Sequence, residues 1–126
     1  QHEDEYMQHG SEGWQVHDAL SPLDSEPRAY KKTRDSFFQT ELDAILKKLH
    51  ADTLILCGMQ TEYCVATTCL RAYTMWYKGY LVTDGHTTFD SPVLPAEKII
   101  AHYNHVLPSE LLAPKTTLEL LAIMEA

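Results

Sequence analysis

The chain has 126 residues, 44% of them apolar and 22% charged, which suits a single globular domain over residues 1–126. Its formal charge of -8, from 18 acidic and 10 basic residues, argues against nucleic acid or an anionic membrane surface as a partner. Three cysteines without a paired pattern or zinc spacing argue against a disulfide scaffold and favour a reducing, cytoplasmic setting, and no apolar run is long enough to span a membrane.

The first half of the chain changes from loop to regular elements. Residues 1–27 are polar and interrupted by Gly and Pro, which predicts a loop, and "RAYKK" (28–32) predicts a short strand leading into the next loop. From Ser36, the apolar residues of "SFFQTELDAILKKLH" recur at helical spacing, with Ser36 as the expected N-cap. "DTLILCG" (52–58) then predicts a strand covered on both faces.

The second half alternates helices and strands. A helix is expected from about Glu62 to Lys78, with Gly79 ending it in a left-handed conformation. The remaining elements are predicted as a strand over 80–85, a loop over 86–94, a helix over 95–107, a strand over 111–113 and a helix over 116–126. This order predicts an α/β fold with three α/β/α layers, a parallel sheet and Rossmann-like topology.

Cys64 is the strongest candidate for chemistry. It falls in the first turn of the helix that follows the strand over 52–58, where ligands bind in parallel sheets. Helix N-terminal N–H groups there would stabilise a thiolate, and they would also bind the oxyanion formed when a thiolate attacks a carbonyl. From position alone, a buried packing cysteine is an equal alternative, and that is the role expected for Cys57 and Cys69. Lys32, in the loop after "RAYKK", is a candidate cation for the thiolate, although most lysines are simply solvated.

Three stretches together carry a family resemblance. They are "QH…GSEGWQVHDAL", "KTRDSFFQTEL" and "LILCGMQTEYCVATTCLRAYTMWYKGYLVTDGHTTFD". The motifs within them are K-x-x-x-S-x-F, G-x-x-T-x-x-C-V and a Gly-Tyr before the following strand. In this register the chain resembles the isochorismatase-like cysteine hydrolases, a superfamily that includes nicotinamidases, N-carbamoylsarcosine amidase and streptothricin hydrolase.

The resemblance implies a Cys, Lys, Asp triad. Cys64 matches the nucleophile, and Lys32 matches the lysine that supports the thiolate. The backbone N–H groups of Gln60 and Cys64 match the oxyanion hole, and the Met59–Gln60 peptide matches the bond that the family holds cis. No cofactor is implied, and we expect no metal.

The resemblance also implies that the N-terminal strands are missing from this chain. The family's first strand, which ends in the triad aspartate, should precede a strand ending in "QH", and here "QH" is residues 1 and 2. Neither Asp4 nor Asp35 is placed by the sequence as a substitute. Losing general acid–base catalysis removes about 100-fold to 10,000-fold in rate, so we expect the chain alone to be a poor enzyme.

Other polar and aromatic residues have simpler interpretations. Trp14 and Tyr63, together with Met59, are expected to wall the substrate pocket, whereas the spacing of Trp76 predicts a core residue. His86, Thr87 and Thr88 are expected in a loop near the same cleft, with His86 as a hydrogen-bonding residue rather than a catalytic one, and Asp84 resembles a structural aspartate. His102 and His105 lie three residues apart, but no third metal ligand accompanies them.

The leading hypothesis is a cysteine-dependent hydrolase of the amidase type. It would cleave a small amide or a related C–N bond through a thioester on Cys64. The alternatives are a truncated or degenerate, non-catalytic relative that acts as a binding or oligomerisation domain, and a thiol sensor that uses Cys64 without turnover. The expected partners are a small-molecule amide and a second copy of the chain, because missing strands would leave apolar surface to cover.

Overall fold

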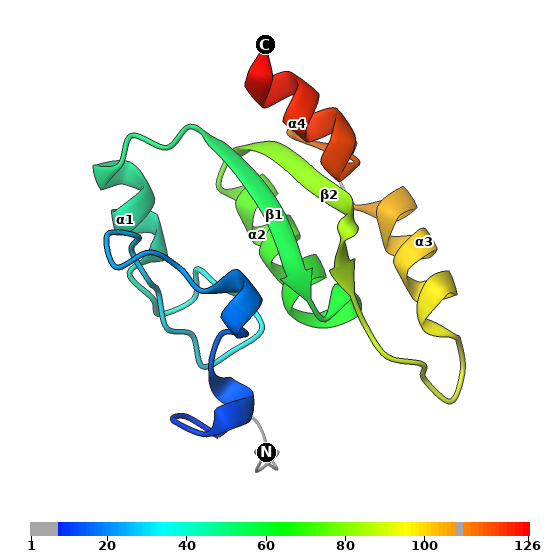
Figure 1. Cartoon of the computed structure of the whole chain (residues 1–126). Coiled ribbons are helices and arrows are strands. Elements are labelled where there is room, and N and C mark those ends of the chain that lie inside the picture. Colours follow the sequence, from blue (N-terminus) through cyan, green and yellow to red (C-terminus); the bar gives the residue numbers. More distant parts are fainter. Residues whose placement is uncertain (1–7, 108–109) are drawn as a thin grey trace.

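The protein is a parallel three-stranded sheet flanked by helices, seen in a computed structural model that describes residues 8–107 and 110–126 (Figure 1). The elements, in chain order, are the 3-10 turns η2 (Glu12–Trp14) and η3 (Asp18–Leu20), α1 (Leu42–Lys48), β1 (Thr53–Met59), the π-helical turn η4 (Thr61–Val65), α2 (Ala66–Thr74), β2 (Lys78–Thr87), α3 (Ala96–Val106), β3 (Leu112–Lys115) and α4 (Thr117–Glu125).

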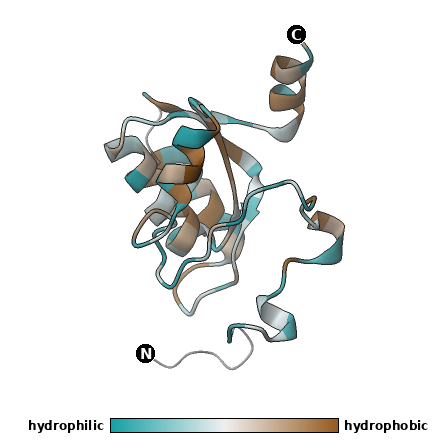
Figure 2. Ribbon diagram, turned by 90° about the vertical axis from the view of Figure 1, so that its left-hand side faces the viewer, coloured by the Kyte–Doolittle hydropathy of each residue, from teal (hydrophilic) through white to brown (hydrophobic). Residues whose placement is uncertain are grey.

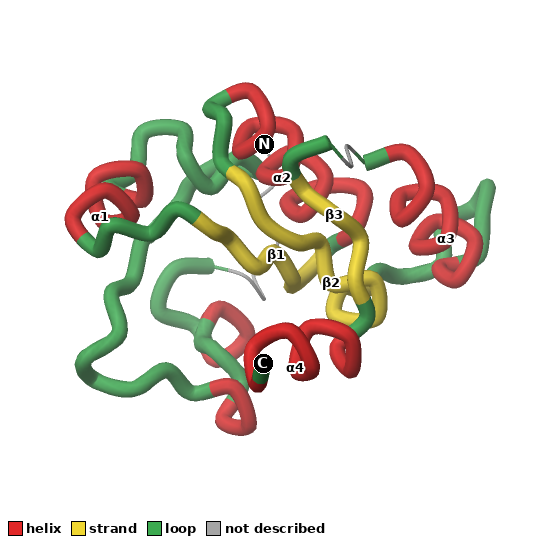
Figure 3. The backbone as a smooth tube through the Cα atoms, turned by 90° about the horizontal axis from the view of Figure 1, so that it is seen from above, coloured by secondary structure: helices red, strands yellow, loops and turns green. Residues whose placement is uncertain are grey.

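The sheet has the order β1-β2-β3, and each neighbouring pair is parallel. Parallel neighbours need a crossover, which η4 with α2 provides between β1 and β2, and α3 provides between β2 and β3. Figure 3 shows α2 on one side of the sheet and α4 on the other, with α1 and α3 at opposite ends. The predicted α/β class with a parallel sheet is confirmed.

The register between β1 and β2 changes near their carboxyl ends. Leu56 lies opposite Leu81, but Gly58, only two residues later, lies opposite His86. Strand β2 therefore makes a local excursion over residues 82–85 before it pairs with the end of β1. Because of this excursion, His86 stands beside the segment that leads into η4.

The hydrophobic core lies between the sheet, α2 and the loop before α1. Its buried residues are Phe37, Val65, Ala66, Cys69, Ala72, Leu81, Leu107 and Leu112. Strand β1 contributes through the partly buried Leu54 and Leu56, while its opposite face leaves Ile55 and Met59 about half exposed. The expectation that this strand is covered on both faces is wrong, and so is that of a buried Cys57, because no described element covers that face. Cys69 is fully buried, as expected.

The two helices next to the core begin or end elsewhere than expected. Helix α1 begins at Leu42 and not after Ser36, since residues 36–41 form turns stabilised by side chains. Helix α2 ends at Thr74, and the residue with a left-handed conformation is Trp76, with φ of 64°. Trp76 is 81% exposed, so its prediction as a core residue is wrong.

Gly79 belongs to β2 and is needed there for close packing. Its φ is 154°, and an added Cβ would overlap the backbone carbonyl of Leu54 on β1. Only glycine permits this approach of two backbones. The glycine that seemed to end a helix therefore brings two strands together.

Residues 28–32 are not a strand. Within the described part of the chain, these residues pair with no strand. The side-chain contact of Lys31 with Cys64 connects this segment to the rest of the fold instead. Extended sequence alone does not make a strand, because the backbone groups need a neighbouring strand to pair with.

Helix α4 is well capped but poorly covered. The Thr116 side chain accepts from the Glu119 N–H, and Glu119 accepts from the Thr116 N–H. Four large apolar residues of α4 are nevertheless exposed, and Figure 2 shows this helix largely apolar at the C-terminal end. They are Leu118, Leu121, Ile123 and Met124. No helix in the described ranges is long and apolar enough to cross a membrane.

Candidate active site

A small cavity of about 180 Å³ lies at the carboxyl end of β1. Its walls come from the loop before α1, from the end of β1 and from the η4–α2 segment. They are lined by Lys31, Ser36, Leu56, Cys57, Gly58, Met59, Cys64, Val65 and Thr68. The carboxyl end of a parallel strand is where ligands bind in this class of sheet, and Cys64 lies on this cavity.

A lysine contacts the Cys64 thiol, and it is Lys31. The Lys31 Nζ lies 3.2 Å from Cys64 Sγ and also donates to the Thr33 carbonyl at 2.9 Å. The sequence motif pointed to Lys32, which is exposed and has no such contact. In an unpaired extended segment, side-chain direction depends on local turns and not on strand alternation, so a shift of one residue changes which lysine faces the thiol.

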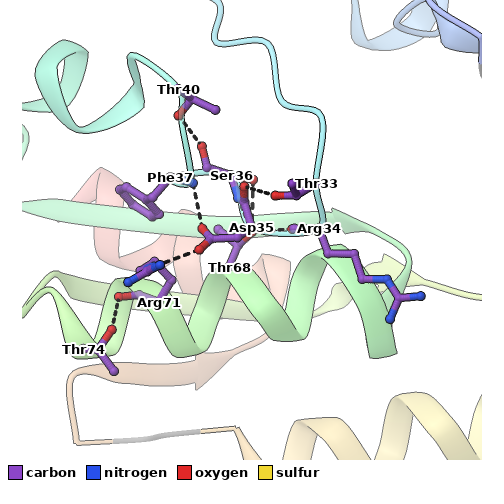
Figure 4. Close-up of polar contacts among 9 residues, drawn as sticks. All are labelled: Thr33, Arg34, Asp35, Ser36, Phe37, Thr40, Thr68, Arg71 and Thr74. Carbon is purple, nitrogen blue, oxygen red and sulfur yellow. Dashed lines mark hydrogen bonds and ion pairs between the residues drawn. The ribbon is translucent and has the colours of Figure 1, made fainter. Parts of the chain in front are cut away.

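The loop that carries Lys31 is anchored to α2 by an ion pair (Figure 4). Asp35 accepts from the Arg71 Nε and from the Phe37 N–H, both at 2.8 Å. Burial alone would raise the pKa of Asp35, but the Arg71 hydrogen bond and the Phe37 N–H outweigh it and hold that pKa below its usual value. Asp35 therefore has a structural role, which is to hold the loop against α2.

A second contact ties the same loop to α2 close to the thiol. Thr68 accepts from the Ser36 N–H at 3.2 Å, and its hydroxyl lies 3.0 Å from that of Ser36. Thr68 is one turn beyond Cys64 on the same face of the helical segment, so the loop is joined to the helical segment that carries Cys64. Ser36, expected as a helix cap, serves in this junction.

The backbone turns sharply between β1 and Cys64. The Met59–Gln60 peptide is cis, as the resemblance implied. The Gln60 carbonyl then accepts from the N–H groups of Tyr63 and Val65, at 3.1 and 3.2 Å. The Cys64 N–H lies between these two donors in sequence, at the start of the helical segment.

Polar contacts to β2 hold this turn from the other side. Thr61, which is fully buried, lies 2.9 Å from His86 Nδ1, and His86 Nε2 lies 2.8 Å from Asn104 Oδ1 on α3. Thr88 donates to Glu62 Oε1 at 2.8 Å, and Glu62 Oε2 is buried without a hydrogen-bond partner among the described residues. His86 lies in β2 and is only 5% exposed, so its expected place in a loop is wrong, whereas its hydrogen-bonding role agrees with these contacts.

The three residues expected to wall the pocket are not all together. Met59 lines the cavity. Trp14 stacks on Tyr30 with ring centroids 5.8 Å apart, and the Arg34 guanidinium lies 4.1 Å from the centroid of the Tyr63 ring. Neither aromatic residue is among those that line this cavity.

A larger depression of about 810 Å³ lies at the opposite, amino-terminal end of the strands. It is bordered by residues of α1 and by the starts of β1 and β2, including Asp52, Thr53 and Lys78. It contains neither Cys64 nor Lys31. The Cys64 thiol and the Lys31 ammonium meet instead at the smaller cavity.

Two polar features have structural partners. Asp84 accepts from both the N–H and the hydroxyl of Thr117, which fastens the start of α4 to β2 and lowers the pKa of Asp84. His102 packs edge-on against Tyr103. In residues 8–107 and 110–126, no group of three or more His, Cys, Asp or Glu side chains is placed to hold a metal ion.

Among the described residues, the expected triad has no third member at the thiol. Within the described ranges, no carboxylate is hydrogen bonded to Cys64 or to Lys31. The "QH" motif and Asp4 lie outside the described residues.

These features define a parallel α/β domain with a cysteine and a lysine in contact beyond the end of an edge strand. Residues 1–97 match the isochorismatase domain model, and the chain belongs to this family of hydrolases.

Curated relatives share part of this chain. It is 34% identical over 83 residues to streptothricin hydrolase of Streptomyces noursei, which covers 66% of this chain and 30% of that protein. It is 30% identical over 97 residues to the uncharacterized isochorismatase family protein YddQ of Bacillus subtilis, covering 74% and 53%.

Solved structures agree with the fold. An isochorismatase family protein matches with a TM-score of 0.80 and 29% identity, over 86% of this chain and 65% of that one. A cysteine hydrolase from Pseudomonas syringae pv. phaseolicola matches with a TM-score of 0.87 and 24% identity, over 93% and 57%. The chain therefore spans less than two thirds of each of these relatives.

Proposed function

We propose that this chain carries the nucleophile of a cysteine-dependent hydrolase that cleaves a small amide or a related C–N bond. The observation that carries the proposal is the 3.2 Å contact between Lys31 Nζ and Cys64 Sγ at the carboxyl end of β1. An ammonium next to a thiol favours the thiolate, which is the reactive form. The role assigned to Lys32 by the motif passes to Lys31 in this proposal.

The proposed reaction has two stages. The Cys64 thiolate attacks the carbonyl carbon, forming a C–S bond and an oxyanion that accepts hydrogen bonds from the backbone N–H groups of Gln60 and Cys64. The C–N bond then breaks as the nitrogen takes a proton and leaves as an amine or ammonia. Water next attacks the thioester, releases a carboxylic acid and returns the thiolate.

The proton for the leaving nitrogen requires an acid near the thiol. In the family that the chain resembles, the triad aspartate has this role, and no described carboxylate is bonded to the Cys64–Lys31 pair. We propose that full activity needs such an acid, because losing general acid–base catalysis slows turnover about 100-fold to 10,000-fold. Added formate should raise the rate of the 126-residue chain by standing in for the carboxylate, and an intact mass of the native protein above 14.4 kDa would reveal further chain in which to seek one.

The direct test is ammonia release from a panel of small primary amides and N-carbamoyl compounds. Wild-type protein is compared with C64A and with the matched control C57S, which changes another cysteine of the same cavity. We expect C64A to abolish release and an acyl adduct to map to Cys64 in the wild type, with C57S retaining activity. Equal rates for wild type and C64A would refute the proposal.

Two alternatives are decided by the same experiments. Rapid stoichiometric alkylation of Cys64 at neutral pH without ammonia release would support a thiol sensor, and the absence of both would support a non-catalytic relative. The three cysteines are unpaired, which agrees with the reducing, cytoplasmic setting that we propose.

Association into a homo-oligomer stays a prediction. Its support is the exposed apolar surface of β1 and α4, which includes Ile55, Met59 and Leu118. Light scattering coupled to size exclusion measures it, and a monomer at micromolar concentration would contradict it.

A further inference from the structure

We infer that a buried hydrogen-bond chain from Thr61 through His86 to Asn104 positions the oxyanion-binding turn beside Cys64, with His86 as the neutral tautomer protonated at Nε2. This inference rests on the proposed function, because the turn matters for acyl transfer. It makes His86 a positioning residue that touches neither the substrate nor the thiol.

The tautomer follows from the partners. Asn104 Nδ2 donates to the Thr83 carbonyl at 3.0 Å, and a carbonyl only accepts, so the Asn104 oxygen must face His86. That oxygen also only accepts, so His86 Nε2 carries a proton. In a neutral ring Nδ1 is then bare, and the Thr61 hydroxyl donates to it across 2.9 Å.

The chain joins three elements that are distant in sequence. Thr61 opens η4, His86 lies near the end of β2, and Asn104 is on α3. Thr61 is 0% exposed and His86 is 5% exposed, so water does not replace these contacts easily. The hydrogen-bond chain ends on the backbone carbonyl of Thr83, in the excursion of β2.

A second contact reinforces the first. Glu62 follows Thr61 and accepts from the hydroxyl of Thr88, which lies two residues beyond His86. Two consecutive residues of η4 are thus fastened to the same end of β2. The residue before them is Gln60, whose N–H is a proposed oxyanion donor, and Cys64 follows three residues after Thr61.

The position of this anchor predicts which step depends on it. Acyl transfer needs backbone donors aimed at the oxyanion, and removing one such donor typically costs about 100-fold to 1,000-fold. Alkylation of a thiolate by iodoacetamide forms no oxyanion. Loosening η4 should therefore slow acylation of Cys64 much more than its alkylation.

The experiment compares the two reactions on Cys64 in the same variants. The probe for acylation is p-nitrophenyl acetate, whose acetyl group passes to Cys64 as p-nitrophenolate leaves, and the probe for alkylation is iodoacetamide. Peptide mass spectrometry assigns each adduct. T61V removes the hydroxyl but keeps the shape, T61S keeps the hydroxyl, and T74V removes a threonine hydroxyl bond at the far end of α2.

We expect T61V to slow acetylation of Cys64 about tenfold or more while alkylation changes less than about twofold. T61S and T74V should match the wild type in both reactions. Unchanged acetylation in T61V overturns the inference. Equal slowing of both reactions, or faster alkylation through a loosened fold, also overturns it, because either result indicates a merely structural role.

A second pair of variants keeps the test decisive if T61V does not fold. In H86N the side-chain oxygen replaces Nδ1 as an acceptor for Thr61, whereas in H86Q the amide mimics Nε2 and leaves Thr61 without its acceptor. H86N should acetylate faster than H86Q, and the reverse order overturns the inference.

Nitrogen NMR of His86 separates this inference from the proposed function. We expect a protonated Nε2 and a bare Nδ1 in the wild type at neutral pH. A proton on Nδ1 overturns the inferred tautomer, and a bare Nε2 overturns the hydrogen-bond chain, even if the enzyme is active. No acetylation of wild-type Cys64 overturns the proposed function and the catalytic consequence drawn from it, even if the tautomer is as inferred.

Discussion

Neutralising Lys31 should slow reaction of the Cys64 thiol by about tenfold, whereas neutralising Lys32 should not. Two unit charges 3.2 Å apart attract each other by about 1.3 kcal/mol in a medium like water, and this value applies because Lys31 is exposed. A free-energy difference of about 1.4 kcal/mol corresponds to a tenfold change in a rate constant.

The assay is the second-order rate of iodoacetamide alkylation of Cys64 at pH 7 and low salt, followed by peptide mass spectrometry. K31M keeps the length of the side chain and removes the charge, and K32M makes the same change one residue along the chain. Circular dichroism controls for loss of the fold. The reasoning would be refuted by equal rates for K31M and wild type, or by K32M slowing the reaction as much as K31M.

Three further predictions concern stability and reactivity. Burial raises the pKa of Cys69 to about 11, so Cys69 should resist alkylation at pH 7 in the folded protein and react only when guanidinium unfolds it. The pKa of Asp35 is lower in the folded state than in the unfolded state, so its carboxylate stabilises the fold above the unfolded value near 3.8, and this contribution is lost as the pH falls through the folded value. D35N should accordingly reduce the free energy of unfolding by about 1 kcal/mol at pH 7 and by less as the pH falls below 4, and a difference independent of pH would contradict the ion pair with Arg71. G79A should cost about 3 kcal/mol in urea unfolding, because its Cβ would overlap the Leu54 carbonyl, and a loss below about 1 kcal/mol would show that the strands separate easily.

The sequence predicts the sheet and its helices well, because these elements depend on local periodicity. The strand over 52–58 and the helix over 95–107 lie close to β1 and α3 as observed. The outcome for Gly79 shows where such reasoning fails. A glycine after a helical pattern fits a helix end, but here the close approach of Leu54, 25 residues earlier, decides its role.

The candidate site is also predictable only in part, because some of its contacts depend on local sequence and others on residues distant in the chain. The position of Cys64 on the cavity follows from its place after a strand, and the cis peptide follows from the family motif. The choice between Lys31 and Lys32 depends on the turns of an unpaired segment, which no periodic pattern determines. The partnership of Thr61 with His86 depends on strand register, which is a contact between residues 25 positions apart.

The excursion of β2 over residues 82–85 divides the strand into two halves, and the direction of the side chains in one half does not fix their direction in the other. Up to its first residue, Val82, the strand pairs with β3, and after it His86 and Thr87 pair with the end of β1. The bend is tight, since a Cβ on Gly85 would lie 2.7 Å from Val82 Cγ1. Side chains alternate faces along a strand, so deleting one residue within the bend would turn His86 away from Thr61 while the paired core half of β2 kept its phase. A change in the length of this short bend would therefore break the contact between Thr61 and His86 while leaving the fold intact.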